Sequence, residues 1–326
     1  MKGITVIICC YNSAARLPRT LACLQAQVAP PDFKWEIVLV NNASTDDTVA
    51  VAQSIWSREF PTRTVCRIVE EPIPGQYFAR MRGVLEARYK VVMFCDDDNE
   101  LDKDYVYQAW KVMAKDDRIG AAGGQIHPVT DAASWPDWFE EYKDKYATGV
   151  PAPQSGDVSH RGFVLGAGMI TRRHLFLQVF DERYPSLLNG RHGSSLSTGD
   201  DFEYCKRLLL WGYTLYYEQC LKIHHFIPQE RLTFNYRERL MQGILASRTV
   251  LSEYDKALIL QKRNQHKNRW RLLLLGPFRI LFARLGLSSR NLTDERLVFF
   301  YLAPFTMKAD PVKTIIKRFI QHQNDL

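Results

Sequence analysis

Short apolar runs alternate with helix-like stretches through the first third of the chain. Each apolar run is short enough to be a buried strand, and the stretches between the runs have the length and periodicity of helices. This alternation predicts βαβ units and a mainly parallel sheet flanked by helices, an α/β fold. The predicted strands are Ile4–Cys10, Trp35–Val40, Thr64–Val69 and Lys90–Cys95, and the predicted helices are Ala15–Gln27, Asp47–Ser57, Tyr77–Arg88 and Asp102–Lys115.

The pattern becomes less regular after Ile119–Ile126. Residues 127–162 are rich in proline, glycine, aspartate and aromatic residues. A long irregular segment inside a compact domain is more often functional than accidental. Regular patterns then return, and they predict a strand at Phe163–Thr171, a helix at Asp201–Trp211, a strand at Tyr213–Glu218 and a helical, basic region from about Gln229 onward.

The basic residues are concentrated toward the C-terminal end. Residues 222–326 contain 19 lysines and arginines against 8 acidic residues, a balance of +11, whereas residues 1–221 contain 24 against 28, a balance of −4. A basic tail of this kind is suited to an anionic partner, either nucleic acid or an anionic membrane surface. We expect a compact domain at residues 1–228 and a helical, basic extension at residues 229–326.

Two apolar segments of the extension bear on membrane binding. Trp270–Leu287 contains Arg271, Arg279 and Arg284, whereas a spanning helix needs roughly 20 mostly apolar residues. Leu297–Met307 is too short to span. We expect the first segment to lie on a membrane surface with one cationic and one apolar face. The alternative is that both segments pack against the first domain.

The cysteines indicate the compartment. The chain has seven cysteines and no CxxC pair, which favours a reducing environment. The apolar run at Ile4–Cys10 is too short for a signal peptide and lacks a cleavage site of small residues. These features predict a cytoplasmic protein, with peripheral attachment to the inner face of the membrane if the tail binds lipid.

Three consecutive aspartates, Asp96, Asp97 and Asp98, follow the predicted strand Lys90–Cys95 with no basic residue nearby in the sequence. Open α/β sheets bind their ligands at the ends of strands. Carboxylates this close repel one another unless a cation lies between them. Mg²⁺ and Mn²⁺ suit such oxygen ligands and usually share their coordination shell with a substrate's phosphates. The triplet therefore indicates a metal-held phosphorylated substrate, with a solvated acidic turn as the alternative.

Four motifs occur in a characteristic order along residues 3–230. Together they resemble the inverting family 2 glycosyltransferases with the GT-A fold, a Rossmann-like architecture. Pro74–Arg80 and Gly166–Met169 resemble two further segments of that family. The four motifs are Tyr11–Ser13, Asn41–Thr48, Phe94–Asn99 and Thr198–Leu208.

The resemblance implies transfer of one sugar from a nucleotide-diphosphate donor, a UDP-sugar being favoured, with Mn²⁺ or Mg²⁺ as cofactor. The acceptor would be a hydroxyl on a cell-surface glycan or a lipid-linked precursor, and no nucleic acid is expected as a partner. Asp201 would be the general base, and Asp98 with His225 would hold the metal. The remaining donor-binding residues would be Tyr11, Asn12, Asn41 and Asn42 near the base and ribose, Arg80 near the base or diphosphate, Asp96 on the ribose, and Asp97 and Gly168 beside them.

Some features depart from the family pattern or leave alternatives open. Most relatives carry Asp-Asp or Asp-Asn where this chain has Asn41-Asn42, so base preference is less defined. Trp135, Trp138 and Phe139 could be core residues, or they could stack on a sugar acceptor or touch lipid. One competing function is a sugar nucleotidyltransferase, although such enzymes carry a glycine-rich phosphate loop with a basic residue after the first strand. The other is a non-catalytic membrane- or RNA-binding protein that uses the basic tail.

Overall fold

The computed structural model describes residues 2–56, 64–191, 196–266 and 311–322. The chain divides into two compact units, Met1–Arg248 and Thr249–Leu326. Both apolar segments expected to meet a membrane or pack on the first domain, Trp270–Leu287 and Leu297–Met307, lie outside the described residues. Among the helices that are described, none is long and apolar enough to cross a membrane.

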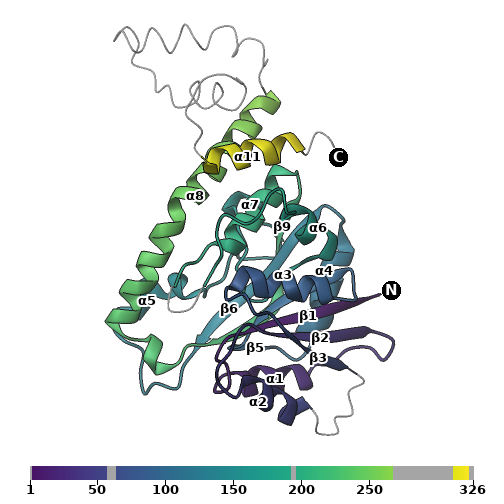
Figure 1. The fold of residues 1–326 in the computed structure, drawn as a ribbon, viewed down its shortest axis with the longest axis vertical. Coiled ribbons are helices and arrows are strands. Elements are labelled where there is room, and N and C mark those ends of the chain that lie inside the picture. Colours follow the sequence, from purple (N-terminus) through teal and green to yellow (C-terminus); the bar gives the residue numbers. More distant parts are fainter. Residues whose placement is uncertain (1, 57–63, 192–195, 267–310, 323–326) are drawn as a thin grey trace, which may run out of the picture. The chain divides into compact units, whose positions relative to one another are not determined.

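The first unit is built on one nine-stranded sheet (Figure 1). Its strands are arranged in the order β3-β2-β1-β4-β8-β6-β9-β5, and β7 pairs with β9 outside this path. The strands are β1 (Gly3–Cys10), β2 (Lys34–Asn41), β3 (Val65–Glu70), β4 (Val91–Asp96), β5 (Asn99–Leu101), β6 (Ile119–Val129), β7 (Gly156–Asp157), β8 (Ile170–Arg172) and β9 (Thr214–Phe226).

The strand directions bring four chain segments to one edge of the sheet. β3, β2, β1 and β4 run parallel to one another. β8 is antiparallel to β4, and β6 is antiparallel to β8, so β6 and its parallel neighbour β9 again run in the direction of β4. The carboxyl ends of β1, β2, β4 and β9 therefore meet at the same edge, where α/β sheets place their ligands.

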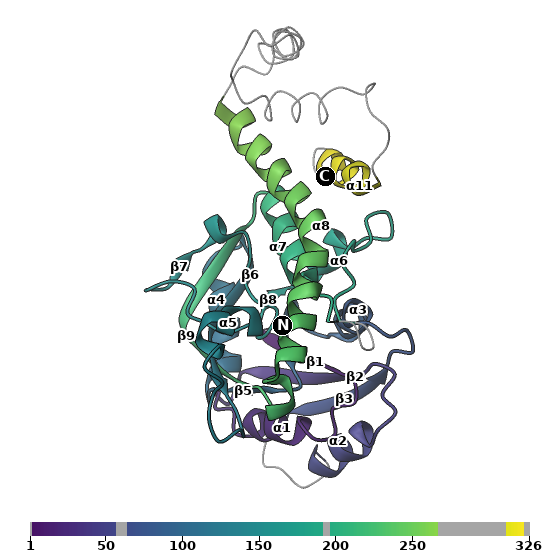
Figure 2. The same ribbon diagram turned by 90° about the vertical axis from the view of Figure 1, so that its left-hand side faces the viewer.

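Helices cover both faces of the sheet (Figures 1 and 2). On one face, apolar residues of α1, α2 and α4 pack on the alternate side chains of β1 that include Ile4 and Ile8. On the other face, α3 approaches so closely that a Cβ on Gly83 would lie 2.3 Å from Ile7. The helices are α1 (Leu17–Gln25), α2 (Thr48–Trp56), α3 (Gln76–Glu86), α4 (Tyr105–Lys115), α5 (Phe139–Tyr142), α6 (Arg173–Val179), α7 (Asp200–Leu210) and α8 (Phe234–His266).

The regular first third of the chain forms the elements that its pattern predicted, with ends that differ by a few residues at most. The strand predicted at Phe163–Thr171 is wrong, because only Ile170–Arg172 is extended into the sheet. Gly168 has a φ of 73°, which a continuous strand does not accommodate. The Gly166 amide donates to a side chain of α7 instead of to a neighbouring strand. β9 is also longer than the predicted Tyr213–Glu218 and continues to Phe226.

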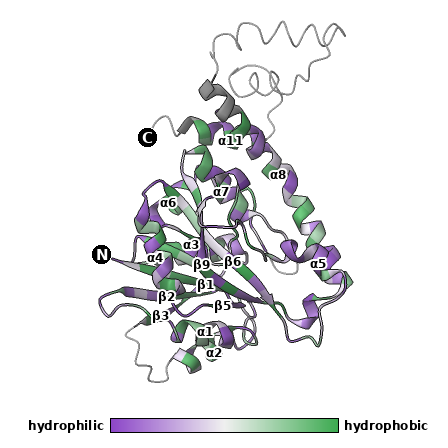
Figure 3. Cartoon of the chain, turned by 180° about the vertical axis from the view of Figure 1, so that it is seen from behind, coloured by the Kyte–Doolittle hydropathy of each residue, from purple (hydrophilic) through white to green (hydrophobic). Residues whose placement is uncertain are grey.

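The irregular segment after β6 contributes a second, aromatic core. Phe139 and Tyr146 are buried there against Leu240 of α8, and Trp135 and Trp138 pack on them partly buried. The rings of Trp135 and Phe139 are stacked with their centroids 4.1 Å apart. The aromatic residues after β6 therefore serve as core. Figure 3 shows the hydrophobic stretches of the central strands and the alternation of hydrophobic and polar segments along α8.

The second unit contains the end of α8 and the helix α11 (Pro311–His322). Its buried side chains include Tyr254 and Ala257 of α8, and Ile316 and Phe319 of α11. The apolar residues of α11 recur at helical spacing, and basic residues lie between them, so the helix is amphipathic.

Candidate active site

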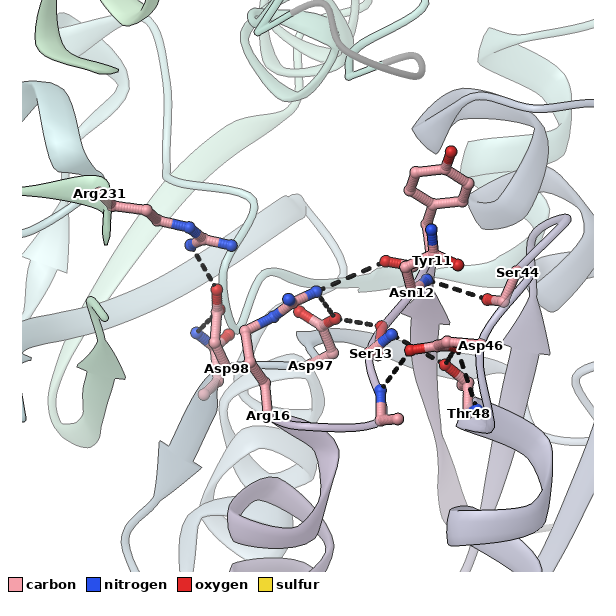
Figure 4. Close-up of polar contacts among 12 residues, drawn as sticks. Tyr11, Asn12, Ser13, Arg16, Ser44, Asp46, Thr48, Asp97, Asp98 and Arg231 are labelled. Atoms are coloured by element: carbon pink, nitrogen blue, oxygen red, sulfur yellow. Dashed lines mark hydrogen bonds and ion pairs between the residues drawn. The ribbon is translucent and has the colours of Figure 1, made fainter. Parts of the chain in front are cut away.

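The loops at the carboxyl ends of β1 and β2 are fastened to each other (Figure 4). The Asn12 amide donates to Ser44 Oγ at 3.1 Å, and the Thr45 amide donates to Asn12 Oδ1 at 2.8 Å. The Ser13 amide donates to Thr48 Oγ1 at 2.8 Å. Asn12 has a φ of 49°, a left-handed conformation that asparagine tolerates better than most residues. The side chain of Asn12 is therefore committed to shaping the loop.

Three other residues predicted to contact the nucleotide lie at the same edge. The Tyr11 ring is 43% exposed and points away from the loop contacts, so a ligand can reach it (Figure 4). Asn41 donates through Nδ2 to Glu70 at 2.8 Å, while its buried Oδ1 has no partner among the described residues. Asn42, in contrast, uses both ends of its amide inside the protein, with Nδ2 on the Ile73 carbonyl and Oδ1 on the Gly75 amide. Asn41 is thus better placed than Asn42 to accept a hydrogen bond from a base.

Two arginines contact the aspartate triplet in the structure, although no basic residue lies near it in the sequence. Arg16 Nη2 lies 2.6 Å from Asp97 Oδ2, and Ser13 Oγ donates to the same oxygen. Arg231 Nη1 lies 2.7 Å from Asp98 Oδ2. Figure 4 shows the two arginines approaching the two carboxylates from different elements. Asp97 is therefore a buried anchor for the β1 loop, and its mutual repulsion with Asp98 is offset by arginine charge.

Asp98 and His225 are brought together as a candidate metal site. His225 Nε2 lies 3.5 Å from Asp98 Oδ1, and both side chains are buried. His225 Nδ1 is a buried nitrogen without a partner among the described residues. Burial alone would raise the pKa of Asp98, but His225 and Arg231 outweigh it and hold that pKa well below its usual range.

This pair fits a divalent cation only if the substrate supplies further ligands. Among the described residues, no group of three or more histidine, cysteine or acidic side chains could hold a metal by itself. Mg²⁺ sites beside phosphates typically use one or two protein carboxylates plus phosphate oxygens and waters. One carboxylate and one imidazole therefore match a cation that is bound together with a diphosphate.

Asp96 interacts electrostatically with Arg80 as well as with Asp98 of the metal pair. Its carboxylate is partly buried and makes no hydrogen bond within the described part of the chain. Burial raises the pKa of Asp96, and the Arg80 charge partly opposes that shift. Asp96 is thus an acceptor that a ribose hydroxyl can approach.

Arg80 connects the triplet to the acidic pair at the start of α7. Its Nη1 lies 2.6 Å from Asp200 Oδ2, and both side chains are almost fully buried. The guanidinium also lies 5.2 Å from the centroid of the Phe94 ring. Burial opposes the charge of Arg80, but Asp200, Asp96 and Asp201 together raise its pKa. Within the protein Arg80 is paired with Asp200, and its predicted contact with the base or diphosphate stays a prediction.

Asp201 is held with its carboxylate in a defined orientation. Its Oδ2 accepts from the Gly166 amide at 2.7 Å and its Oδ1 from the Phe202 amide at 2.9 Å. Burial, followed by the neighbouring Asp200, raises the pKa of Asp201 to about 6. A carboxylate with such a pKa is suited to accept a proton near neutral pH.

Close packing explains the absence of a side chain at two glycines of the family motif, Gly166 and Gly168. A Cβ on Gly166 would lie 2.5 Å from Arg80 Nη2 and 3.0 Å from Asp201 Oδ2. A Cβ on Gly168 would lie 2.4 Å from the Tyr105 hydroxyl, which donates to the Gly168 carbonyl at 3.1 Å. Donor contact by Gly168 stays a prediction, whereas its packing explains why no side chain fits there.

A buried ion pair anchors α7, the helix that presents Asp200 and Asp201. Arg207 Nη2 lies 2.7 Å from Glu203 Oε1, and neither side chain has exposed surface. Glu203 accepts from the Leu188 amide at 2.9 Å, and Arg207 donates to the Val179 and Tyr184 carbonyls. These bonds tie α7 to the loop that precedes it, which fixes the position of the acidic pair.

A pocket lies beside the segment that binds Asp201. Its cavity volume is about 160 Å³, which is smaller than the roughly 300–1,000 Å³ typical of ligand sites. Phe163 in its wall is stacked on Phe202, the residue after Asp201, with the ring centroids 4.0 Å apart. The residues that line the pocket include Gly123, Gly124, Val150, Arg161, Phe163, Ala167 and Tyr217.

Sequence reasoning missed Arg16 and Arg231. Arg16 lies in a loop that the chain pattern assigned to a helix, and Arg231 is one of many basic residues near the start of the extension. The only sequence signal for Arg231 was its position six residues after His225, which is too weak to single it out. Their contacts with the aspartates could be recognised only in the structure, where the strand order brings the two segments together.

Family models place these features in a known context. The model "Glycosyl transferase family 2" matches residues 5–168, and "Glycosyl transferase family group 2" matches residues 91–309. The chain belongs to glycosyltransferase family 2, as the motifs predicted.

Curated relatives match over part of their length. A dolichyl-phosphate beta-glucosyltransferase of Drosophila melanogaster is 31% identical over 148 residues, which cover 42% of this chain and 44% of the relative. A poly-beta-1,6-N-acetyl-D-glucosamine synthase of Staphylococcus epidermidis is 28% identical over 125 residues, covering 38% and 28%. The matched part therefore spans less than half of each of these relatives.

Solved structures confirm the GT-A type of fold. S. aureus TarS 1-349 superposes with a TM-score of 0.52 at 14% identity, covering 99% of this chain and 88% of TarS 1-349. GalNAc-T7, solved with UDP, GalNAc and Mn²⁺, gives a TM-score of 0.51 at 15% identity, covering 70% of this chain and 44% of GalNAc-T7. At these identities the likeness concerns the fold alone.

Proposed function

We propose that this chain is an inverting glycosyltransferase that moves a single sugar from a nucleotide-diphosphate donor, with UDP-sugars favoured, to an acceptor hydroxyl. The observation that supports it most directly is the arrangement around Arg80. This one buried guanidinium lies between the aspartate triplet at the end of β4 and the Asp200-Asp201 pair at the start of α7. Arg80 therefore connects Asp96, the proposed ribose ligand, to Asp201, the proposed base, which has a pKa of about 6.

The residues divide the work of a single displacement. The exposed ring of Tyr11 and the free oxygen of Asn41 bind the nucleoside end of the donor, and Asp96 accepts from its ribose. Asp201 faces the acceptor and takes the hydroxyl proton as the oxygen attacks the anomeric carbon. Attack from the face opposite the leaving diphosphate inverts that carbon. Arg80 pairs with the buried Asp200, which helps to hold the neighbouring Asp201 in its orientation.

Asp98 and His225 would hold Mn²⁺ or Mg²⁺ together with the donor. When bound, such a cation neutralises the negative charge of the departing diphosphate. GalNAc-T7, which shares the fold, was solved with UDP and Mn²⁺. Arg231, next to Asp98, adds positive charge on the same side of the donor.

The pocket beside Asp201 is the proposed binding place of the acceptor. Phe163 and Tyr217 in its wall supply aromatic surface of the kind that binds sugar rings. We place the acceptor on a cell-surface glycan or a lipid-linked precursor, because the chain carries a basic C-terminal part and resembles a dolichyl-phosphate glucosyltransferase and a polysaccharide synthase. The basic part would attach the protein to the inner face of the membrane, and flotation of the full chain with anionic liposomes tests this.

The first test is calorimetric binding of UDP, GDP, CDP and dTDP, each with Mn²⁺ and then with EDTA. Binding of one nucleotide that is lost without metal supports the donor site and identifies the base. If the folded protein binds none of the four, the donor site proposed here is wrong.

Two substitutions separate donor binding from transfer. Asp98→Asn weakens metal-dependent nucleotide binding. Asp201→Asn retains nucleotide binding but lowers the transfer rate by about 10²–10⁴-fold, the usual contribution of a positioned base. Asp32→Asn, in the exposed loop before β2, is the control and leaves both unchanged. Wild-type turnover by Asp201→Asn would contradict the assignment of the base.

A sugar nucleotidyltransferase has less support. The turn after β1 is Tyr11-Asn12-Ser13-Ala14, without the glycine-rich phosphate loop and basic residue that such enzymes carry. A non-catalytic RNA-binding protein would have no use for Asp201 held beside the buried Arg80–Asp200 pair. Strongly salt-dependent RNA binding by a chain that binds no nucleotide diphosphate would favour that alternative.

A further inference from the structure

The two ion pairs of the aspartate triplet differ in how they are built. Arg16 and Asp97 form a local anchor in which Ser13 and the β1 loop also take part. Arg231 lies in the segment that joins β9 to α8, 133 residues from Asp98 in the sequence, and it contacts Asp98 in the structure. Only the second pair involves a residue proposed to bind metal.

Asp98 presents different atoms to its two neighbours. Its Oδ1 lies 3.5 Å from His225 Nε2, and its Oδ2 lies 2.7 Å from Arg231 Nη1. The backbone carbonyl of Asp98 also accepts from the Phe226 amide at 2.9 Å, which fixes the carboxylate against β9. Arg231 therefore contacts one oxygen of the carboxylate to which a metal ion would also bind.

Arg231 is held in place by the aromatic core. Its backbone carbonyl accepts from the Tyr146 hydroxyl at 3.1 Å, and its backbone amide donates to the Pro228 carbonyl at 2.9 Å. Tyr146 is itself buried against Phe139 and Leu240. The Arg231 side chain is 16% exposed, so a ligand can still reach it.

A guanidinium and a divalent cation on one buried carboxylate repel each other strongly. A diphosphate relieves that repulsion, because its oxygens can bind the metal and accept from the guanidinium at the same time. Arginine is well suited to this exchange, since its planar fork fits carboxylate and phosphate equally well.

We propose that Arg231 is the built-in counter-cation of Asp98 and transfers its hydrogen bonds to the donor diphosphate when metal and nucleotide bind together. Arg231 is thus a positioning residue that couples metal binding to nucleotide binding. The proposal rests on the donor site described under the proposed function. It means that the metal binds weakly alone and tightly only with the nucleotide.

The test is Mn²⁺ binding to the full chain, measured by electron paramagnetic resonance of free Mn²⁺ with and without the nucleotide that the wild type binds. In wild type, the nucleotide strengthens Mn²⁺ binding by a factor within the roughly 5–150-fold range typical of coupled sites. Arg231→Gln has two opposite effects: Mn²⁺ alone binds more tightly, and nucleotide with Mn²⁺ binds more weakly. The coupling factor falls toward one.

The controls separate charge from geometry. Arg118→Gln removes the same charge from an exposed pair with Asp116 and changes neither affinity. Arg231→Lys keeps the charge, so Mn²⁺ alone binds as in wild type. Arg231→Met keeps the alkyl stem and serves if the glutamine variant does not fold. An unfolded chain would lose both affinities, so opposite changes cannot arise from misfolding.

The outcomes distinguish this inference from the proposed function. If the wild type binds no nucleotide with Mn²⁺, the proposed donor site and the proposed role of Arg231 are both wrong. If the wild type binds nucleotide, but Arg231→Gln and Arg231→Met bind Mn²⁺ alone no more tightly than it does, only the role of Arg231 falls.

Discussion

Arg80 and Asp200 form a buried ion pair, with Nη1 and Oδ2 2.6 Å apart, that joins α3 to the first residue of α7. The pair places a fixed positive charge next to Asp201, which follows Asp200 in the chain. Both members influence the pKa of Asp201 in opposite directions, Asp200 raising it and Arg80 lowering it. The behaviour of the proposed base therefore depends on a neighbouring pair that need not touch the substrate.

The pH dependence of sugar transfer tests this relationship. Because Asp201 must be deprotonated to act, and its pKa is about 6, the rate rises with pH through about 6 and levels off above it. Asp200→Asn removes the charge that raises the pKa, so the acid limb moves to lower pH. Arg80→Gln removes the charge that lowers it, so the limb moves to higher pH. A profile that is the same in all three proteins would contradict Asp201 as the titrating group.

A methyl group at Gly166 is expected to disturb the base directly. Its Cβ would lie 2.5 Å from Arg80 Nη2 and 3.0 Å from Asp201 Oδ2, so one of the two side chains must move. Gly166→Ala should lower the transfer rate by about 10²-fold, the effect of a displacement near 1 Å at a reacting group, while calorimetry shows unchanged nucleotide binding. Gly156→Ala is the matched control, since its Cβ meets nothing within 4 Å, and it should behave as wild type.

Phe163 is expected to affect the acceptor but not the donor. It lines the pocket beside Asp201 and is stacked on Phe202. Phe163→Ala removes one aromatic wall, and the KM for the acceptor should rise by up to about tenfold, since aromatic contacts are worth about 0.5–1.5 kcal/mol. Leu85→Ala, an exposed apolar residue on α3, is the control. A change in nucleotide affinity with no change in acceptor KM would place the acceptor elsewhere.

The buried pair of α7 is expected to dominate local stability. Arg207→Leu leaves the Glu203 carboxylate buried without its charged partner, which costs about 3–5 kcal/mol of unfolding free energy. Arg183→Leu removes an exposed arginine paired with Asp181, and it should lower the unfolding free energy far less, because solvent screens exposed ion pairs. Denaturant unfolding of the two variants measures both values. Equal losses of unfolding free energy in the two variants would show that burial does not increase the contribution of the α7 pair to stability.

Several features of the fold followed directly from local sequence. The apolar runs ending at Cys10, Val40 and Cys95 formed parallel strands, because a run buried on both faces of a sheet must be almost continuously apolar. The segment around Gly166 could not be predicted in the same way. Its apolar residues suggest a strand, but the Gly166 amide donates to Asp201, and Gly168 has a positive φ that ends the extended run.

The sequence by itself determined the order of strands and helices in the first third of the chain, the glycosyltransferase family and the candidate acidic residues of the site, because periodicity and short motifs are local properties of the chain. Only the tertiary structure decided which charges meet. Arg231 and Asp98 are 133 residues apart, and Arg80 and Asp200 are 120 apart, yet each pair is within 2.7 Å. Coulomb interactions depend on distance in space and on burial, and neither quantity can be read from a list of residues.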